Sequence, residues 1–125
     1  MTNQEILDAA AATYAEGYVP DHAWFSKKKS EKGVCAVAAA VYGVRRGKMY
    51  DGQTKDLEAA AKVLGKTEPF VRGVAEGFDD DYEDPYYWDD QPANEKEEAR
   101  IAKEYSAGYR FGERAAKKFK VKEDD

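Results

Sequence analysis

The sequence predicts an all-α protein, a compact bundle of about five helices around one buried central helix. Its 125 residues suffice for a single helical domain, 1–125, with a hydrophobic core. The run GVCAVAAAVYGVRRG, residues 33–47, is apolar on every face, which is typical of a buried helix, and we expect that helix at 34–45. The run is too short to cross a bilayer and ends in arginines. No alternating pattern of useful length indicates a strand.

The other helices are predicted from caps and apolar periodicity. Thr2 and Glu5 have the spacing of a capping box, Gly65 is placed to end the third helix as a left-handed cap, and Asn94 is placed to cap the fifth. Prolines interrupt the stretch between the fourth and fifth helices, which we therefore expect to be a loop. These signals predict helices at about 4–16, 34–45, 55–64, 67–78 and 95–120, and an acidic tail, 121–125, that should fray.

Small residues recur four positions apart in three of the predicted helices. Glycine inside a helix costs about 1 kcal/mol relative to alanine, so a chain that accepts it repeatedly must use the missing side chains. We interpret the pattern as close helix crossing, and the alternative is an approach surface for a partner helix. The residues are Ala39, Gly43, Gly47, Gly73, Gly77, Gly108, Gly112 and Ala116.

Composition and charge limit the kinds of partner and compartment that we expect for this protein. The formal net charge of -5 and the pI of about 5.0 argue against attraction to nucleic acid or to an anionic membrane, so we expect neither as a direct partner. One cysteine excludes an internal disulfide. The N-terminal residues lack the basic and apolar regions of a signal peptide. We therefore expect a cytoplasmic protein, of a bacterium or of a phage-infected host cell.

Cys35 is the candidate nucleophile. It lies at the N-terminal turn of the predicted central helix, where the helix dipole lowers a thiol pKa. The single histidine, His22, lies upstream of it, whereas the histidine follows the cysteine in many thiol hydrolases, and apolar neighbours favour a buried cysteine. One Cys and one His cannot form a tetrahedral zinc site without carboxylates. We expect no catalytic residue, metal or cofactor; a small thiol-dependent enzyme using Cys35 is the alternative.

The most distinctive feature is the acidic aromatic segment, defined here as residues 79–90. It contains seven carboxylates, four aromatic residues and no basic residue. Disordered acidic runs are poor in aromatic residues, which argues against a flexible tail. Tyr and Trp anchor protein interfaces, and carboxylates steer a basic partner. We expect partner binding by Asp79, Asp80, Asp81, Tyr82, Glu83, Asp84, Tyr86, Tyr87, Trp88, Asp89 and Asp90.

Two other interpretations fit the same segment. In the first, the aromatic cluster 86–88 turns inward as a lid on the core while the acids stay solvated. In the second, the segment binds calcium, because Asp79 and alternate acids after it match the first ligand positions of an EF-hand loop. The sixth position, Asp84, should then be Gly, and the twelfth, Asp90, should be Glu. We therefore expect no calcium site.

The predicted function is a non-enzymatic protein-interaction module in which the acidic aromatic segment docks on a basic partner surface. Carboxylates along a rigid surface can take the place of backbone phosphates. The partner would then be a nucleic-acid-binding protein, and the chain a DNA mimic of the kind that phage inhibitors use. A third function class is a structural homo-oligomer packed through the small-residue helix faces.

Two stretches carry a resemblance. The G-x-C-A start of the central helix, Gly33 to Ala36, and the later FVRGVAEGFDD resemble segments of small helical proteins of unknown function from bacterial and phage genomes. The resemblance covers part of the chain and its motifs are loose. It implies no activity, and no functional residue is carried over from it.

Overall fold

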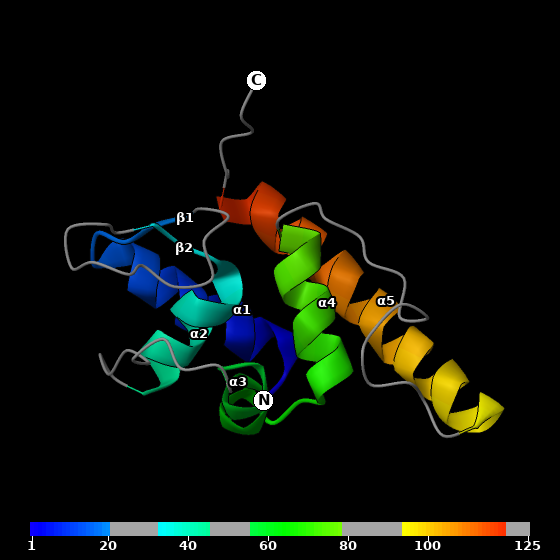
Figure 1. The fold of residues 1–125 in the computed structure, drawn as a ribbon. Helices are drawn as coiled ribbons and strands as arrows, with labels where there is room; N and C mark the ends of the chain where they lie inside the picture. Colours follow the sequence, from blue (N-terminus) through cyan, green and yellow to red (C-terminus); the bar gives the residue numbers. More distant parts are fainter. Residues whose placement is uncertain (21–32, 46–55, 79–93, 120–125) are drawn as a thin grey trace.

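The computed structural model describes residues 1–20, 33–45, 56–78 and 94–119 (Figure 1). Most of these residues belong to the helices α1 Asn3–Ala15, α2 Ala36–Val44, α3 Asp56–Leu64, α4 Glu68–Phe78 and α5 Glu95–Phe119. The predicted all-α bundle is confirmed. One detail was not predicted: the two-residue strands β1 Val19–Pro20 and β2 Gly33–Val34 pair in parallel. Strands this short show no alternating pattern in the sequence. The predicted tail, 121–125, lies outside the described residues.

The helix α2 is the centre of the bundle. Each residue from Ala36 to Val41 is at most 2% exposed, and α2 contacts all four of the other helices. Alanine and valine on every face let those neighbours approach closely. The prediction of a buried central helix is therefore confirmed, with a shift at its start. Cys35 has extended backbone angles and is the N-cap, while Val34 belongs to β2.

The helix α1 packs on α2 through a close backbone contact and a buried hydrogen bond. A Cβ atom placed on Gly43 would lie 2.9 Å from the carbonyl carbon of Ala9, closer than such atoms pack. The Thr13 side chain, 1% exposed, donates a hydrogen bond to the carbonyl oxygen of Ala39 at 2.6 Å. The same hydroxyl lies 3.3 Å from the carbonyl oxygen of Ala9 in its own helix, so this buried donor, which would cost about 1–3 kcal/mol if unpaired, is satisfied.

The helices α4 and α5 form the most extensive helix pair, and their backbones touch. A Cβ atom on Gly73 would lie 2.8 Å from the amide nitrogen of Tyr109, and one on Gly112 would lie 2.7 Å from that of Phe78. Gly77 and Gly108 meet the partner helix's backbone in the same way. The glycine spacing predicted a close helix crossing, and this prediction is confirmed.

The two helices run parallel. Gly73 lies against Tyr105 and Gly77 lies against Tyr109, so the contacts advance in the same direction along both helices (Figure 1). The C-terminal end of α4 therefore lies beside Gly112, which is about 25 Å along the α5 axis from Glu95 at 1.5 Å per residue. As a result, the N-terminal half of α5 projects beyond α4 (Figure 1).

The predicted caps form at the helix ends. The amide of Glu5 donates to the Thr2 hydroxyl at 3.1 Å, and the Thr2 amide donates to the Glu5 carboxylate at 2.8 Å, which completes the capping box. Gly65 ends α3 with a φ of +64°, the left-handed conformation that glycine adopts without strain. Asn94 Oδ1 accepts the amide of Glu97 at 2.9 Å. Local sequence signals therefore set these helix boundaries.

Leucine in place of Gly112 should destabilise the protein. The neighbouring atoms belong to the α4 backbone, which cannot rotate away as a side chain would, so we expect Gly112→Leu to lower the free energy of unfolding by on the order of 3 kcal/mol. The matched control is Ala102→Leu, on an exposed position of the same helix, which should change it by less than about 0.5 kcal/mol. Urea unfolding of both variants measures the difference, and equal midpoints would contradict the close backbone contact.

The capping box should make stability depend on pH through Glu5. Hydrogen bonds from the backbone and then the side chain of Thr2 lower the pKa of Glu5 below its ordinary value of 4.5. A carboxyl whose pKa is lowered by folding stabilises the protein above its unfolded pKa, and this contribution disappears as the pH falls through the folded pKa. We expect the stability difference between the wild type and Glu5→Gln to shrink from pH 7 to pH 3 in urea titrations. A constant difference would contradict this.

Candidate functional site

The predicted binding residues lie outside the described residues, so the structure places none of the acidic aromatic segment. It does place the residues on either side. Phe78, the last residue of α4, is 1% exposed, and Asn94, before the first residue of α5, is held by its capping bond to Glu97. Both attachment points of the segment therefore belong to the α4–α5 pair. The lid interpretation and the expectation that there is no calcium site concern the same residues and stay untested.

A partly buried polar chain links α4 to α5. The hydroxyl of Tyr105, a residue that is 0% exposed, donates to Glu76 Oε1 at 3.0 Å. Arg72 Nε donates to the other carboxylate oxygen of Glu76 at 3.2 Å. Both oxygens of Glu76 are thus engaged in hydrogen bonds between side chains. This arrangement holds the helices in register and satisfies a buried hydroxyl.

The thiol of Cys35 is enclosed in the core. The residue is 1% exposed, and as the N-cap of α2 it makes no side-chain capping bond. Burial is the main cause that raises the pKa of the neighbouring Tyr14 above its ordinary range, and Cys35 contributes to a smaller extent. His22 lies outside the described residues. The predicted structural role of Cys35 fits its burial.

Metal-ligand clusters and membrane spans are not found in the part of the chain that the structure describes. No group of three or more His, Cys, Asp or Glu side chains in residues 1–20, 33–45, 56–78 and 94–119 is close enough to hold a metal ion. None of the helices in these ranges combines the length and the apolar character that a membrane span needs.

Two adjoining hollows lie along the projecting half of α5, and together we call them the basic groove. The first, of about 670 Å³, lies between α5 and the turn from α3 to α4, and its walls include Lys66, Phe70, Arg100 and Lys103. The second, of about 600 Å³, continues along α5 to Asn94 and shares Arg100 and Lys103 with the first. Apolar surface predominates in both hollows.

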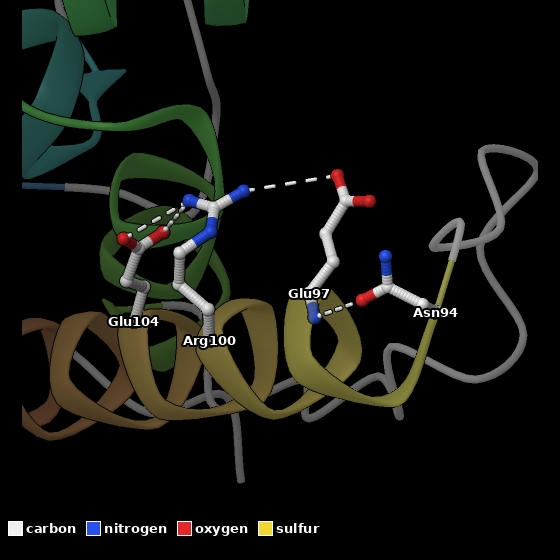
Figure 2. Close-up of polar contacts among 4 residues, drawn as sticks. All are labelled: Asn94, Glu97, Arg100 and Glu104. Carbon is white, nitrogen blue, oxygen red and sulfur yellow. Dashed lines mark hydrogen bonds and ion pairs between the residues drawn. The ribbon is translucent and has the colours of Figure 1, made fainter.

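Within the basic groove, Arg100 is balanced by two carboxylates of its own helix (Figure 2). Its Nη1 atom lies 3.2 Å from both carboxylate oxygens of Glu104, and its Nη2 atom lies 3.8 Å from Glu97 Oε1. Exposed ion pairs at this spacing stabilise a helix by only a few tenths of a kcal/mol, so their main effect is to orient the guanidinium. The excess positive charge of the groove therefore comes from its lysines.

Three lysines supply that excess charge. Lys96 and Lys103 are exposed, and neither forms an ion pair with a residue that the structure describes. The Lys66 ammonium lies 5.3 Å from the centroid of the Phe70 ring, a cation–π distance. The groove thus combines an aromatic wall with ammonium groups that can pair with an acidic ligand.

The basic groove was not predicted from the sequence. Part of its signal was present, because Lys96, Arg100 and Lys103 are spaced i, i+4 and i+7 and so lie on one helix face. Lys66 and Phe70 belong to a different segment, and only the packing of α4 on α5 brings them opposite that face.

Comparisons with known proteins identify no relative. No family model matches the chain, and neither a curated protein nor a solved structure matches it. The resemblance to small bacterial and phage proteins stays a prediction, and the function has to be argued from the residues themselves.

Cys35 should react with a thiol reagent only when the protein unfolds. Because the residue is 1% exposed, Ellman's reagent at pH 8 should label the native protein no faster than it unfolds, and should label it at once in denaturing urea. The absorbance of the released thiolate measures both rates. Rapid labelling of the native protein, with a rate that titrates below the ordinary thiol pKa of about 8.5, would instead support the thiol-dependent enzyme.

Proposed function

We propose that the protein is a non-enzymatic interaction protein whose acidic aromatic segment binds a basic surface of a protein partner. The observation that carries this proposal is the concentration of charge. The segment contains seven carboxylates and no basic residue, whereas the whole chain has a net charge of -5, so the rest of the chain is net positive. Like charges so close together repel one another, and a basic partner would relieve that repulsion.

The way in which the segment is attached supports a binding role. Phe78, directly before the segment, is buried at the end of α4, and Asn94, four residues after Asp90, caps α5, so the chain on both sides of the segment is fixed to one pair of packed helices. A segment restrained at both ends loses less conformational freedom on binding than a free tail does, and more of its contact energy then appears as affinity.

The finer form of the proposal concerns the kind of partner. Carboxylates presented along a surface imitate the phosphates of a nucleic acid, so the partner would be a nucleic-acid-binding protein and the chain its inhibitor. The aromatic residues Tyr86, Tyr87 and Trp88 would anchor the complex, since Tyr and Trp supply much of the binding energy at interfaces. The acidic residues would mainly accelerate association, an effect that salt screens.

The two rival classes find less support. A thiol-dependent enzyme needs a reachable nucleophile, whereas Cys35 is 1% exposed. A homo-oligomer packed through small-residue faces needs those faces at the surface. Gly73, Gly77, Gly108 and Gly112 instead contact backbone inside the α4–α5 pair. These observations favour the binding role of the acidic aromatic segment.

Neutralising the acidic aromatic segment should abolish partner capture. We expect immobilised wild-type protein to retain basic, nucleic-acid-binding proteins from a bacterial lysate, and double-stranded DNA to displace them because both ligands occupy one groove. The variant Asp80→Asn, Asp81→Asn, Asp84→Asn should lose these proteins. The matched control is Asp8→Asn, Glu58→Gln, Glu113→Gln, which removes three exposed carboxylates on other helices and should keep them. Quantitative mass spectrometry compares the eluates, and equal capture by both triple variants would refute the proposal.

The variant Trp88→Ala separates the binding role from the lid. As an interface anchor, Trp88 contributes nothing to the isolated fold, so its removal should leave the melting temperature within about 2 °C of the wild type and accelerate dissociation of the captured partner. As a lid on the core, its truncation would cost about 3–5 kcal/mol and lower the melting temperature substantially. Calorimetry distinguishes these outcomes without knowledge of the partner.

A further inference from the structure

We propose that the basic groove binds the acidic aromatic segment of a second copy of the chain, and that two copies exchange their segments in a closed dimer. This inference rests on the proposed function in taking the acidic aromatic segment as the binding element. It adds that the chain carries a surface of the complementary kind.

The chemistry of the basic groove suits an acidic and aromatic ligand. Lys66 and Lys103 line its first hollow and Lys96 and Lys103 its second, while Glu97 and Glu104 are both engaged by Arg100. The half-buried Phe70 ring and the predominantly apolar lining offer area for aromatic side chains. A bare anion would use the ammonium groups and leave the apolar lining unfilled.

The segment carries the complementary chemistry. Its seven carboxylates match the ammonium groups of the groove, and its four aromatic residues match the apolar lining. In protein interfaces, charged residues at the rim help to select the partner, and aromatic residues at the centre hold it. The segment and the groove together supply both kinds of group. A nucleic acid fits the groove less well. The acidic segment comes shortly before Asn94, a residue that lines the groove, and its negative charge would repel a polyanion.

Position favours a reciprocal exchange between two copies. Asn94 lines the second hollow and follows closely after the segment in the sequence, so the groove begins where the segment is attached. Because the segment joins the chain close to the groove, a two-fold axis can bring the groove of each copy to the segment of the other. Such an interface is self-complementary and closes as a dimer, whereas a one-way contact would continue into a filament.

A charge-exchange experiment tests the proposal. One variant reverses the groove, Lys66→Glu and Lys103→Glu. The other reverses the segment by Asp79→Lys, Asp80→Lys, Asp81→Lys, Glu83→Lys and Asp84→Lys, which replace five of its seven carboxylates by ammonium groups. At low salt, sedimentation velocity should show a wild-type dimer that dissociates as salt rises. Each variant alone should dimerise at least about tenfold more weakly, because several exposed pairs become repulsive. An equimolar mixture should restore the dimer, since groove and segment are again opposite in charge at both contacts.

Two controls keep the outcome unambiguous. The variant Lys117→Glu, Lys118→Glu reverses two exposed lysines at the opposite end of α5 and should dimerise like the wild type. Circular dichroism verifies that every variant is folded. Independently of any variant, carbodiimide cross-linking of mixed ¹⁴N and ¹⁵N protein should join Lys66 or Lys103 of one isotope to segment carboxylates of the other.

Three results would overturn the proposal: a wild type that is monomeric at every concentration, a mixture that fails to restore the dimer, or cross-links within single isotopes only. The last result would place the segment in the groove of its own chain. These failures are distinct from failure of the proposed function. A monomeric chain that still captures DNA-displaceable proteins would refute the second copy as partner and leave the binding role of the segment intact.

Discussion

The direct contact between the backbones of α4 and α5 is the constraint on which the rest of the structure depends. Each interior glycine costs a helix about 1 kcal/mol, and the pair contains four of them at the interface. Close approach repays that cost, because it brings carbonyl oxygens against Cα hydrogens and packs Phe78 and Phe111, each 1% exposed, around the crossing. The side-chain bond between Tyr105 and Glu76 adds a directional link to the same interface.

That crossing also sets where charge is presented. Because the two helices run parallel, the chain leaves α4 at one end of the pair and enters α5 at the far end, beyond the reach of α4 (Figure 1). The projecting half of α5 then forms the basic groove with the turn that precedes α4. The places where the acidic aromatic segment is attached, and the position of Lys66 opposite Lys103, both follow from this direction of the helices.

The core consists mainly of apolar side chains, which stabilise the fold. The central helix α2 has no charged side chain, and its six consecutive buried residues are alanine and valine. The thiol of Cys35 and the hydroxyl of Thr13 are both enclosed, the latter bonded to a carbonyl of α2. Among the residues that the structure describes, no charged side chain is buried.

Short-range signals in the sequence determined the helices, because caps and apolar periodicity act within a few residues. The capping box of Thr2 and Glu5 and the cap at Asn94 begin their helices where predicted, and Gly65 ends its helix. The glycine spacing indicated that helices would cross closely. The acidic and aromatic character of residues 79–90 is likewise evident from the sequence, although their positions lie outside the described residues. What the sequence could not indicate is which helix each glycine faces and in which direction, since that depends on contacts between distant segments. Tertiary structure alone therefore decided the parallel α4–α5 pair, the bridge of β1 to β2, and the meeting of Lys66 and Phe70 with the cationic face of α5.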